Sequence, residues 1–204
     1  MPTVISVSDI RKSYGKKRVL HGGHMEANTG ESICVVGENG SGKSTLLKII
    51  AGILRPEGGS ISRMGTVGYC PQQSLLYDYL SVEEHFNLFG SAYNMTRFDI
   101  KKNALELMEL FSFSKYHGYK IHQLSGGTRQ KLNLSLSLLH DPTTLLLDEP
   151  YVGFDYETYE NFLKYTEIAV RKQKCIIMVS HLVFDKNLFD TIYKLKDGII
   201  HEER

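Results

Sequence analysis

The sequence predicts an α/β protein with a predominantly parallel sheet and an inserted helical segment. Short runs of apolar and β-branched residues recur along the chain, and several are apolar at successive positions instead of alternating. Continuous runs of this kind suit strands that helices cover on both faces. Their alternation with helical patterns favours an α/β architecture. The predicted strands cover residues 4–7, 32–36, 66–69, 144–147, 175–179 and 191–195.

A helical pattern replaces the strand pattern between residues 69 and 145. Ser81 and Glu84 fit a capping box, in which each side chain satisfies a free backbone donor of the other residue. Four apolar residues further along recur at the spacing of one helix face: Ile100, Ala104, Leu107 and Phe111. We therefore expect a single domain over residues 1–204, with a core of about 1–73 and 141–204 and a helical subdomain of about 74–140.

Composition limits the classes of protein to consider. The chain has 204 residues, of which 42% are hydrophobic and 23% charged, as is typical of a folded globular domain. The formal net charge of +1 creates no strong field toward nucleic acid or an acidic membrane surface. We expect no signal peptide, because the N-terminus lacks a charged start followed by an apolar stretch. We expect no membrane-spanning helix, because no apolar window approaches ~18–20 residues. Cys34, Cys70 and Cys175 lie in apolar runs without metal-ligand spacing, which indicates buried residues in a reducing compartment.

A glycine-rich loop lies between a predicted strand and a predicted helix. Residues 37–45 fit the phosphate-binding pattern G-x-x-x-x-G-K-[ST] of P-loop nucleoside triphosphatases. Glycines let backbone N–H groups wrap around phosphate oxygens, and the helix N-terminus adds partial positive charge. A simple turn before a helix would have no need for the lysine and the serine. The expected phosphate-binding residues are Gly37, Asn39, Gly40, Ser41, Gly42, Lys43, Ser44 and Thr45.

A second motif carries acidic side chains. An apolar strand over residues 145–147 ends in Asp148 and Glu149. Ligands of open α/β sheets bind at the carboxyl ends of the strands, so we expect this pair near the glycine-rich loop. Asp148 and the Ser44 hydroxyl would then hold Mg²⁺, Lys43 would neutralise the β- and γ-phosphates of a nucleotide, and Glu149 would polarise the attacking water. These two motifs alone do not separate ABC proteins from GTPases, kinases or helicases. Taken alone, an apolar strand with two terminal carboxylates is equally often a strand that meets a solvated turn.

Residues 124–130, Leu-Ser-Gly-Gly-Thr-Arg-Gln, narrow the assignment. They resemble the signature motif of ABC (ATP-binding cassette) ATPases, and they precede the acidic strand as in that family. The resemblance covers essentially the whole chain and implies a RecA-like P-loop core, N-terminal antiparallel strands and an inserted α-helical subdomain. It also implies that two cassettes pair head to tail, so that Ser125, Gly126 and Gly127 of one chain contact the γ-phosphate held by the other.

The remaining motifs of the family match single residues. Tyr14 lies where an aromatic ring stacks on adenine, although a surface tyrosine at a strand end would look the same. Gln72 resembles the glutamine that senses Mg²⁺ and the attacking water, and Asp155 resembles the aspartate that crosses the dimer interface. His181 resembles the histidine that contacts the γ-phosphate. The resemblance thus implies catalytic roles for Glu149, His181, Lys43 and Gln72, and Mg²⁺ coordination by Ser44, Gln72 and Asp148.

Two residues depart from the family pattern. Phe154 replaces the usual leucine before the aspartate of residue 155, and Thr128 follows the signature glycines. Neither change removes a functional group, so we expect ATP hydrolysis to be intact. A catalytically inactive module would conflict with the intact lysine, glutamine, glutamate and histidine named above.

The resemblance implies a role in membrane transport driven by ATP. A cassette without membrane segments must pass its motion to a partner, and residues 77–86 are similar to the export-type cassettes of bacterial drug, antibiotic-peptide and polysaccharide exporters. We expect export, with an importer subunit as the alternative. The expected partners are an integral membrane permease subunit and a second ABC ATPase subunit, either another copy or a relative, and no nucleic acid. The expected location is the cytoplasm, on the inner face of the cell membrane.

The competing class is a soluble ABC ATPase that acts on ribosomes or DNA. Ribosome-associated members usually carry two cassettes with a basic linker, and DNA-repair members usually carry a long coiled coil or a zinc module. This chain has one compact cassette, near-neutral charge, no sustained heptads and no Cys-x-x-Cys. These features favour the transport role.

Overall fold

A computed structural model describes residues 1–180 and 188–203 of the chain. Its strands are β1 (Thr3–Tyr14), β2 (Lys17–Asn28), β3 (Ser32–Val36), β4 (Gly58–Arg63), β5 (Val67–Cys70), β6 (Thr144–Asp148), β7 (Cys175–Ser180), β8 (Thr191–Lys196) and β9 (Ile199–Glu203). Its helices are α1 (Lys43–Ile50), α2 (Val82–Ala92), α3 (Arg97–Leu110), α4 (Gly126–Leu138) and α5 (Tyr156–Arg171), with short 3-10 turns η1 (Ser114–Tyr116) and η2 (Ile121–Gln123). The α/β fold class is confirmed.

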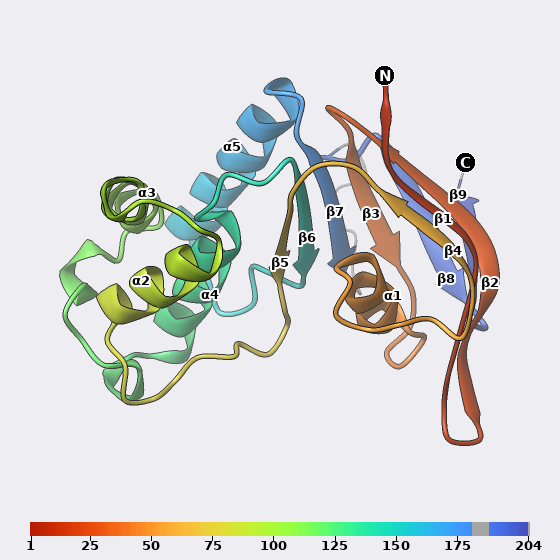
Figure 1. The fold of residues 1–204 in the computed structure, drawn as a ribbon, viewed down its shortest axis with the longest axis horizontal. Coiled ribbons are helices and arrows are strands. Elements are labelled where there is room, and N and C mark those ends of the chain that lie inside the picture. The colour runs from red at the N-terminus through yellow and green to blue at the C-terminus, as the bar shows by residue number, and fades with distance from the viewer. Residues whose placement is uncertain (181–187, 204) are drawn as a thin grey trace. The chain divides into compact units, whose positions relative to one another are not determined.

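The described strands form one sheet in the order β4-β1-β2-β9-β8-β3-β7-β6-β5 (Figure 1). Each predicted strand is present, and the first extends further than expected, to Tyr14. Every residue of β6 and β7 is buried. The continuous apolar runs of these two strands therefore reflect cover on both faces of the sheet, as the sequence indicated.

The sheet combines parallel and antiparallel pairs, in agreement with the predicted parallel core and N-terminal antiparallel strands. Its centre is parallel, because β3 pairs in parallel with β7 and β8, and β6 pairs in parallel with β7. Two hairpins add antiparallel pairs, β1 with β2 and β8 with β9. Left-handed residues make their tight turns: Gly15 has a φ of 60°, and Asp197 and Gly198 have φ of 49° and 74°. The predicted antiparallel strands at the N-terminus are confirmed.

The chain divides into two compact units, and the first contains the sheet. It comprises Met1–Tyr69, Thr143–Glu149 and the described residues of Ile168–Arg204. Helix α1 lies against the sheet (Figure 1) and buries four apolar residues in a core shared with β1, β2, β3 and β7. Burial of each such Leu or Ile side chain contributes roughly 1.5–3 kcal/mol, so α1 is firmly packed against the strand that precedes it. The four residues are Leu46, Leu47, Ile49 and Ile50.

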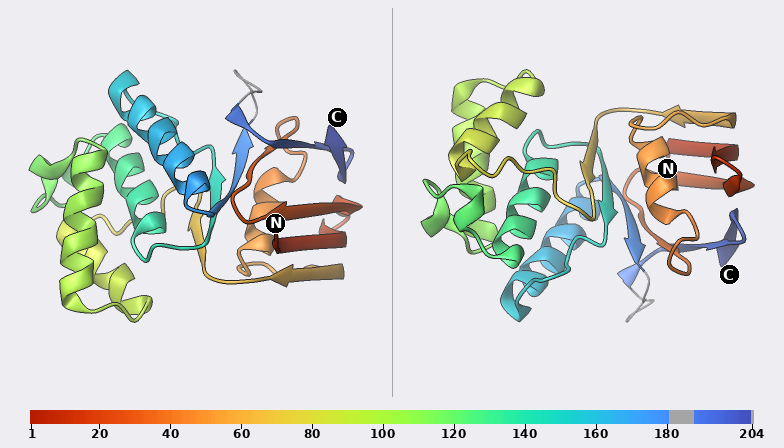
Figure 2. Two further views of the ribbon diagram at one scale, coloured as in Figure 1. Left: turned by 90° about the horizontal axis from the view of Figure 1, so that it is seen from above. Right: turned by 90° about the horizontal axis from the view of Figure 1, so that it is seen from below.

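The second unit is helical. It comprises Cys70–Pro142 and Pro150–Glu167, and its helices α2, α3 and α4 lie beside one another (Figure 2). The capping box at the start of α2 is confirmed: the Glu84 backbone N–H donates to Ser81 Oγ at 3.1 Å, and the Ser81 N–H donates to the Glu84 carboxylate at 2.6 Å. The apolar face predicted from residues 100, 104, 107 and 111 is buried.

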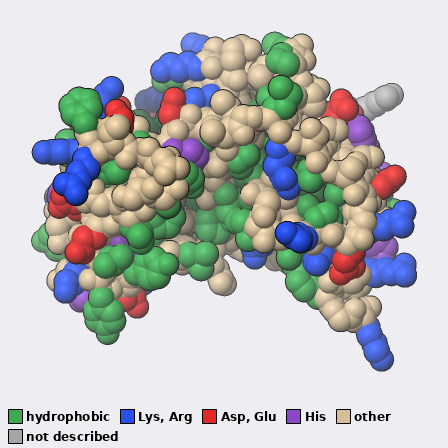
Figure 3. Space-filling view, in the orientation of Figure 1, with side chains coloured by type: hydrophobic (Ala, Val, Ile, Leu, Met, Phe, Trp, Pro, Cys, Tyr) green, Lys and Arg blue, Asp and Glu red, His purple; other side chains and the backbone are tan. Residues whose placement is uncertain are grey.

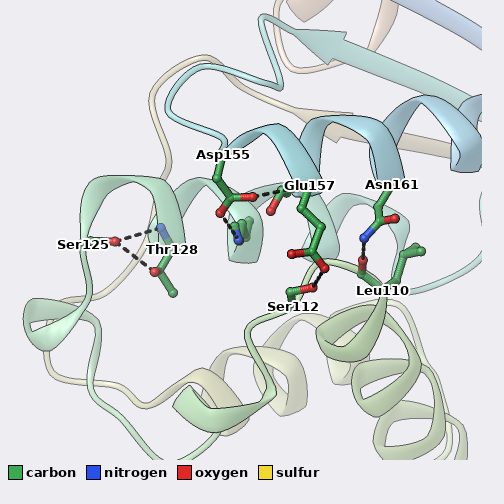
Figure 4. Close-up of polar contacts among 9 residues, drawn as sticks. Leu110, Ser112, Ser125, Thr128, Asp155, Glu157 and Asn161 are labelled. Carbon is green, nitrogen blue, oxygen red and sulfur yellow. Dashed lines mark hydrogen bonds and ion pairs between the residues drawn. The ribbon is translucent and has the colours of Figure 1, made fainter.

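The first part of α5 belongs with the helical unit by its contacts. The predicted boundary put residues 141–204 in the core, whereas residues 150–167 group with the second unit. The Asn161 side-chain amide donates to the Leu110 carbonyl at 3.0 Å, and the Ser112 hydroxyl lies 3.4 Å from the Glu157 carboxylate (Figure 4). These bonds join residues about fifty positions apart, and periodicity carries no information about such pairs. The domain division itself stays a prediction.

His85 of α2 ties down the loop that precedes the helix. Its side chain is fully buried, and Nε2 accepts a hydrogen bond from the Tyr77 backbone N–H at 2.9 Å. Because Nε2 is an acceptor, the ring proton must reside on Nδ1, which lies 2.8 Å from the Ser81 carbonyl oxygen. The neutral ring thus bonds to main chain on both sides and satisfies a backbone donor that belongs to no helix or strand.

We expect His85→Leu to lower the free energy of unfolding by about 2 kcal/mol. Leucine fills a similar volume but leaves the Tyr77 N–H without its acceptor. Urea unfolding followed by circular dichroism measures the change, and His24→Leu, at an exposed position on β2, is the matched control, expected within about 0.5 kcal/mol of the parent. An unfolding midpoint equal to that of the parent would contradict the role of the ring nitrogen.

We also expect two buried thiols to resist alkylation in the folded chain. Burial raises the pKa of Cys34 to about 12, and burial together with Glu31 raises the pKa of Cys175 to about 12. A raised pKa means less thiolate, so at about pH 8 both residues stay protonated when folded, whereas thiols of an unfolded chain titrate near 8.5. Peptide mass spectrometry after iodoacetamide treatment should find both unlabelled in buffer and labelled in concentrated urea. Rapid labelling in buffer would be the opposite result.

Candidate nucleotide-binding site

The glycine-rich loop joins β3 to α1, as the motif requires. Gly40 and Gly42 have φ of 78° and 109°, in the left-handed region that side chains disfavour. Gly42 is the N-cap of α1 and supplies no side-chain acceptor, so the first backbone N–H groups of the helix are available to an anion. The loop therefore has the shape of an anion cradle before any ligand is considered.

Two glycines of this loop allow close packing of the first unit. A side-chain carbon built on Gly37 would lie 2.5 Å from the Leu195 carbonyl oxygen of β8. One built on Gly42 would lie 2.8 Å from Val19 Cγ1 of β2. Any larger residue would push the loop away from these strands. The glycines thus fix the loop against β8 on one side and against the β1–β2 hairpin on the other.

Lys43, the first residue of α1, folds back over the loop. Its side chain is buried, with 6% of the residue exposed, and Nζ donates to the carbonyl oxygens of Gly37 at 2.7 Å and Glu38 at 3.0 Å. Burial lowers the pKa of Lys43, while the nearby carboxylates of Glu149 and Asp148 raise it. Two carbonyl oxygens therefore hold the ammonium group at the loop, and the negative charge of Asp148 and Glu149 acts on it as well.

The loop also contains a buried hydroxyl that lacks a partner among the described residues, that of Ser41. A buried hydroxyl without a hydrogen bond costs about 1–3 kcal/mol unless a ligand satisfies it. Phosphate oxygens would supply acceptors both to this hydroxyl and to the N–H groups at the start of α1. The residues of the loop therefore fit a phosphate group. Asn39 and Gly40 are exposed, whereas Ser44 and Thr45 are partly buried within α1.

The acidic pair lies at the carboxyl end of β6, in the same unit as the loop. Asp148 is 2% exposed, and burial raises its pKa while a hydrogen bond from the Ser44 hydroxyl opposes the rise. The structure thus brings together two of the three predicted Mg²⁺ ligands, an oxygen pair that suits a hard cation. Within the described residues, no group of three His, Cys, Asp or Glu side chains could hold a metal ion. A cation here would take its other ligands from phosphate and water.

Glu149 follows Asp148 in an unusual backbone conformation. It has a φ of 49°, its N–H donates to the Val179 carbonyl of β7 at 3.2 Å, and it is 8% exposed. A left-handed glutamate is uncommon and persists only when its surroundings enforce it. The turn redirects the chain at the end of β6, so that the two carboxylates do not continue the alternation of a strand.

Tyr14 ends β1 next to the turn of the β1–β2 hairpin, whose second strand touches the loop. Tyr14 is exposed, and Val19 and Leu20 of β2 pack against Gly42. The turn of this hairpin carries the exposed basic run of residues 16–18, and a blue side chain extends from the end of the hairpin in Figure 3. Sequence reasoning passed over this basic run, although three successive cations beside a candidate aromatic residue were a visible signal. The stacking role of Tyr14 stays a prediction.

The signature turn lies in the second unit, at the start of α4. Ser125 is the N-cap, and its Oγ accepts from the Thr128 backbone N–H at 3.2 Å (Figure 4). Ser125 and Gly126 are exposed. Gly127 must be a glycine, because a side-chain carbon there would lie 2.5 Å from the Gly153 carbonyl oxygen. The turn therefore presents a serine and a glycine outward and packs its second glycine inward.

Asp155 bonds within its own chain. Its Oδ1 accepts from the Thr158 N–H at 2.8 Å, which caps α5, and its Oδ2 lies 3.0 Å from Lys131 Nζ of α4. Together the Thr158 hydrogen bonds and the Lys131 cation hold the pKa of Asp155 well below its usual range. Sequence reasoning missed Lys131, because an ion pair across 24 residues leaves no local pattern. The role of Asp155 at a dimer interface stays a prediction.

Two predicted site residues, Gln72 and His181, follow strands β5 and β7 in the sequence. Gln72 is exposed and lies just after β5, in the second unit. Its role toward Mg²⁺ stays a prediction. His181 lies outside the described residues.

Comparison with known proteins identifies the family. The sequence profile described as "ABC transporter" matches residues 20–152. "ABC transporter G family member 20" of Dictyostelium discoideum is 30% identical, over 97% of this chain and 29% of its own length. "Linearmycin resistance ATP-binding protein LnrL" of Bacillus subtilis is 30% identical, over 87% of this chain and 61% of its own length. HrtA of Staphylococcus aureus, named for hemin import, is 30% identical over 95% of this chain and 97% of its own length.

Solved structures agree with these sequence relatives. A structure titled as the ATP-binding subunit of an ABC transporter has a TM-score of 0.92 and 25% identity, covering 98% of this chain and 90% of its own. A dimeric structure of a bacterial ABC transporter cassette has a TM-score of 0.88 and 25% identity, covering 98% of both chains. The chain spans less than two thirds of the Dictyostelium and Bacillus relatives, at 29% and 61% of their lengths. The chain belongs to the ABC transporter family, as an ATP-binding cassette.

Proposed function

We propose that this chain binds ATP with Mg²⁺, hydrolyses it, and powers export through a separate membrane subunit. One observation carries the proposal: a buried lysine, the Ser44 hydroxyl and two carboxylates meet at the ends of β3 and β6 within one unit. ATP hydrolysis needs this combination of a cradle for phosphates, a cation site and a base for water. A structural phosphate site would have no need for the two carboxylates.

Each group has a distinct part in the proposed reaction. The N–H groups at the start of α1 and the Ser41 hydroxyl bind phosphate oxygens, and the Lys43 ammonium exchanges its carbonyl partners for the β- and γ-phosphates. Ser44 and Asp148 would hold Mg²⁺, which when bound neutralises charge on the β- and γ-phosphates. Glu149 accepts a proton from the attacking water, and its left-handed backbone sets the direction of that carboxylate.

The proposed working form contains two cassettes. The exposed Ser125 and Gly126 would contact the γ-phosphate on a second cassette, with Asp155 at the interface between them. The dimeric form of the similar bacterial cassette supports this arrangement. Gln72 and His181 would complete the catalytic set, and Tyr14 would stack on adenine. The second cassette is either another copy of this chain or a relative.

Transport is the proposed role, by way of an integral membrane permease subunit on whose cytoplasmic face the chain would lie. None of the described helices is long and apolar enough to cross a bilayer. The resistance protein LnrL favours export, and the import name of HrtA makes import the second candidate. The chemistry of hydrolysis is the same in both directions.

We expect Glu149→Gln to lower kcat for ATP hydrolysis at least about 100-fold, which is roughly the contribution of a general base. The reason is that the amide cannot accept the proton of the attacking water. ATP affinity should be retained. Phosphate release measures turnover, and equilibrium binding of a fluorescent ATP analogue measures affinity. Glu106→Gln, an exposed residue of α3, is the matched control and should behave like the parent. Normal turnover of the Glu149 variant would remove that residue from the proposed role.

We expect a multi-spanning membrane protein to co-purify with the affinity-tagged chain. The chain is isolated in mild detergent, with ATP and vanadate, from the cells that produce it. Vanadate resembles the phosphoryl group in transfer, so it should occupy the proposed γ-phosphate position and hold the two cassettes together. Mass spectrometry identifies the partner, and a Lys43→Ala chain, which should lose nucleotide binding, controls for adventitious capture. Recovery with ribosomes or DNA and no membrane protein would overturn the transport role. Vesicles containing the partner would then give the direction of transport.

A further inference from the structure

We propose, on the basis of the function proposed above, that Thr128 fixes the Ser125 hydroxyl as an outward hydrogen-bond donor to an anionic phosphate oxygen. Thr128 is the residue at which the chain departs from the signature motif of its family. Its side chain lies beneath the exposed serine in the first turn of α4. It would therefore act through Ser125, as a positioning residue for the site.

The hydrogen bond between the Ser125 and Thr128 hydroxyls can have either residue as its donor. The number of protons and lone pairs on Ser125 Oγ shows what each case means for a ligand. The Ser125 hydroxyl has one proton to donate and two lone pairs that accept. One lone pair accepts from the Thr128 backbone N–H at 3.2 Å, and the two hydroxyl oxygens lie 2.9 Å apart (Figure 4). If Thr128 donates, both lone pairs of Ser125 are filled and its proton points away from the turn. If Ser125 donates, its only proton is used inside the turn and none remains for a ligand.

Burial decides which hydroxyl donates. Thr128 is 7% exposed, whereas Ser125 is exposed to solvent. Among the hydrogen bonds of the described residues, Ser125 Oγ is the acceptor within reach of the Thr128 hydroxyl proton. A buried proton without an acceptor is costly, while an exposed one is satisfied by water. Thr128 is therefore the donor, and the Ser125 proton faces outward.

Contacts with the segment of residues 150–155 hold the turn that carries both hydroxyls. Gly127 packs against the Gly153 carbonyl, and Lys131, one turn further along α4, forms its ion pair with Asp155. Between them, the Gln130 side-chain amide donates to the Pro150 carbonyl at 3.2 Å. Three contacts on one helix face thus anchor the start of α4. Because this turn is fixed, the direction of the Ser125 proton is fixed as well. The proton can then be donated to an acceptor that carries negative charge and no proton of its own.

The experiment measures self-association driven by ATP, by sedimentation velocity, in chains that also carry Glu149→Gln so that ATP is not consumed. Thr128→Val keeps the shape of the buried side chain and removes its hydroxyl. The backbone N–H of residue 128 still occupies one position around Ser125 Oγ, so the hydroxyl proton can take either of the other two, and we expect association about twofold weaker for each signature turn that takes part. Thr128→Ser restores the hydroxyl and should restore association. Ser125→Ala should weaken association at least about tenfold, as the loss of a hydrogen bond to a charged group does.

Thr166→Val is the matched control. Its hydroxyl donates to the Leu163 carbonyl at 2.7 Å, three residues back in α5, so the substitution removes a similar local contact away from the signature turn. It should leave association unchanged. Thermal unfolding of each variant checks that the chain remains folded.

Tighter or equal association of Thr128→Val would show that Ser125 is the inward donor and would overturn the proposal. A strong loss with Ser125→Ala at the same time would leave the proposed function intact. If Ser125→Ala associates as the parent does, the role of the signature turn itself fails, and the proposal about Thr128 fails with it.

Discussion

The first unit depends on burying an ammonium group next to two carboxylates. An unpaired buried charge would be intolerable, so Lys43 needs the loop carbonyls and the negative charge of Asp148 and Glu149. Those residues come from the start of α1 and the end of β6, about a hundred positions apart. The parallel register of β3, β7 and β6 brings them to one edge of the sheet. The strand order, the glycines of the loop and the turn at Glu149 all serve this pairing of charges.

In the second unit, the exposed signature turn carries no charged side chain at Ser125, Gly126 or Gly127. Its signature turn offers N–H groups and a hydroxyl to an anion, and its position is set by backbone contact between Gly127 and Gly153. Gln130 and Lys131 extend the contact along the same helix face, since residues three and four apart lie side by side. The loop of residues 150–155 and the start of α4 therefore behave as one piece. A change in either would be felt by the other.

Local patterns predicted much of the fold and the chemistry of the site. Strands β6 and β7 were predictable because burial on both faces leaves a continuous apolar run, and the phosphate loop was predictable because strand, glycines, lysine and helix are contiguous. Strand β2 was not predictable from a local pattern, because its two adjacent glycines and its exposed polar residues interrupt the alternation typical of a strand. The contacts of Gly37 with Leu195 and of Lys131 with Asp155 join distant positions, so only the folded chain reveals them. The roles of Gln72, Asp155 and His181 rest on family resemblance.

Lys43 donates hydrogen bonds to two carbonyls of its own loop, so a nucleotide that binds must replace these carbonyls as its acceptors. The ammonium group already spans two carbonyls of its own loop, so the loop holds its shape in the absence of ligand and little backbone freedom remains to be lost on binding. An incoming anion must replace both carbonyls with stronger, charged acceptors. Each anionic oxygen that contacts the ammonium group favours this exchange, and a ligand with several adjacent phosphates offers more of them than a ligand with one. The loop thus favours polyphosphates through the number of charged acceptors that they bring.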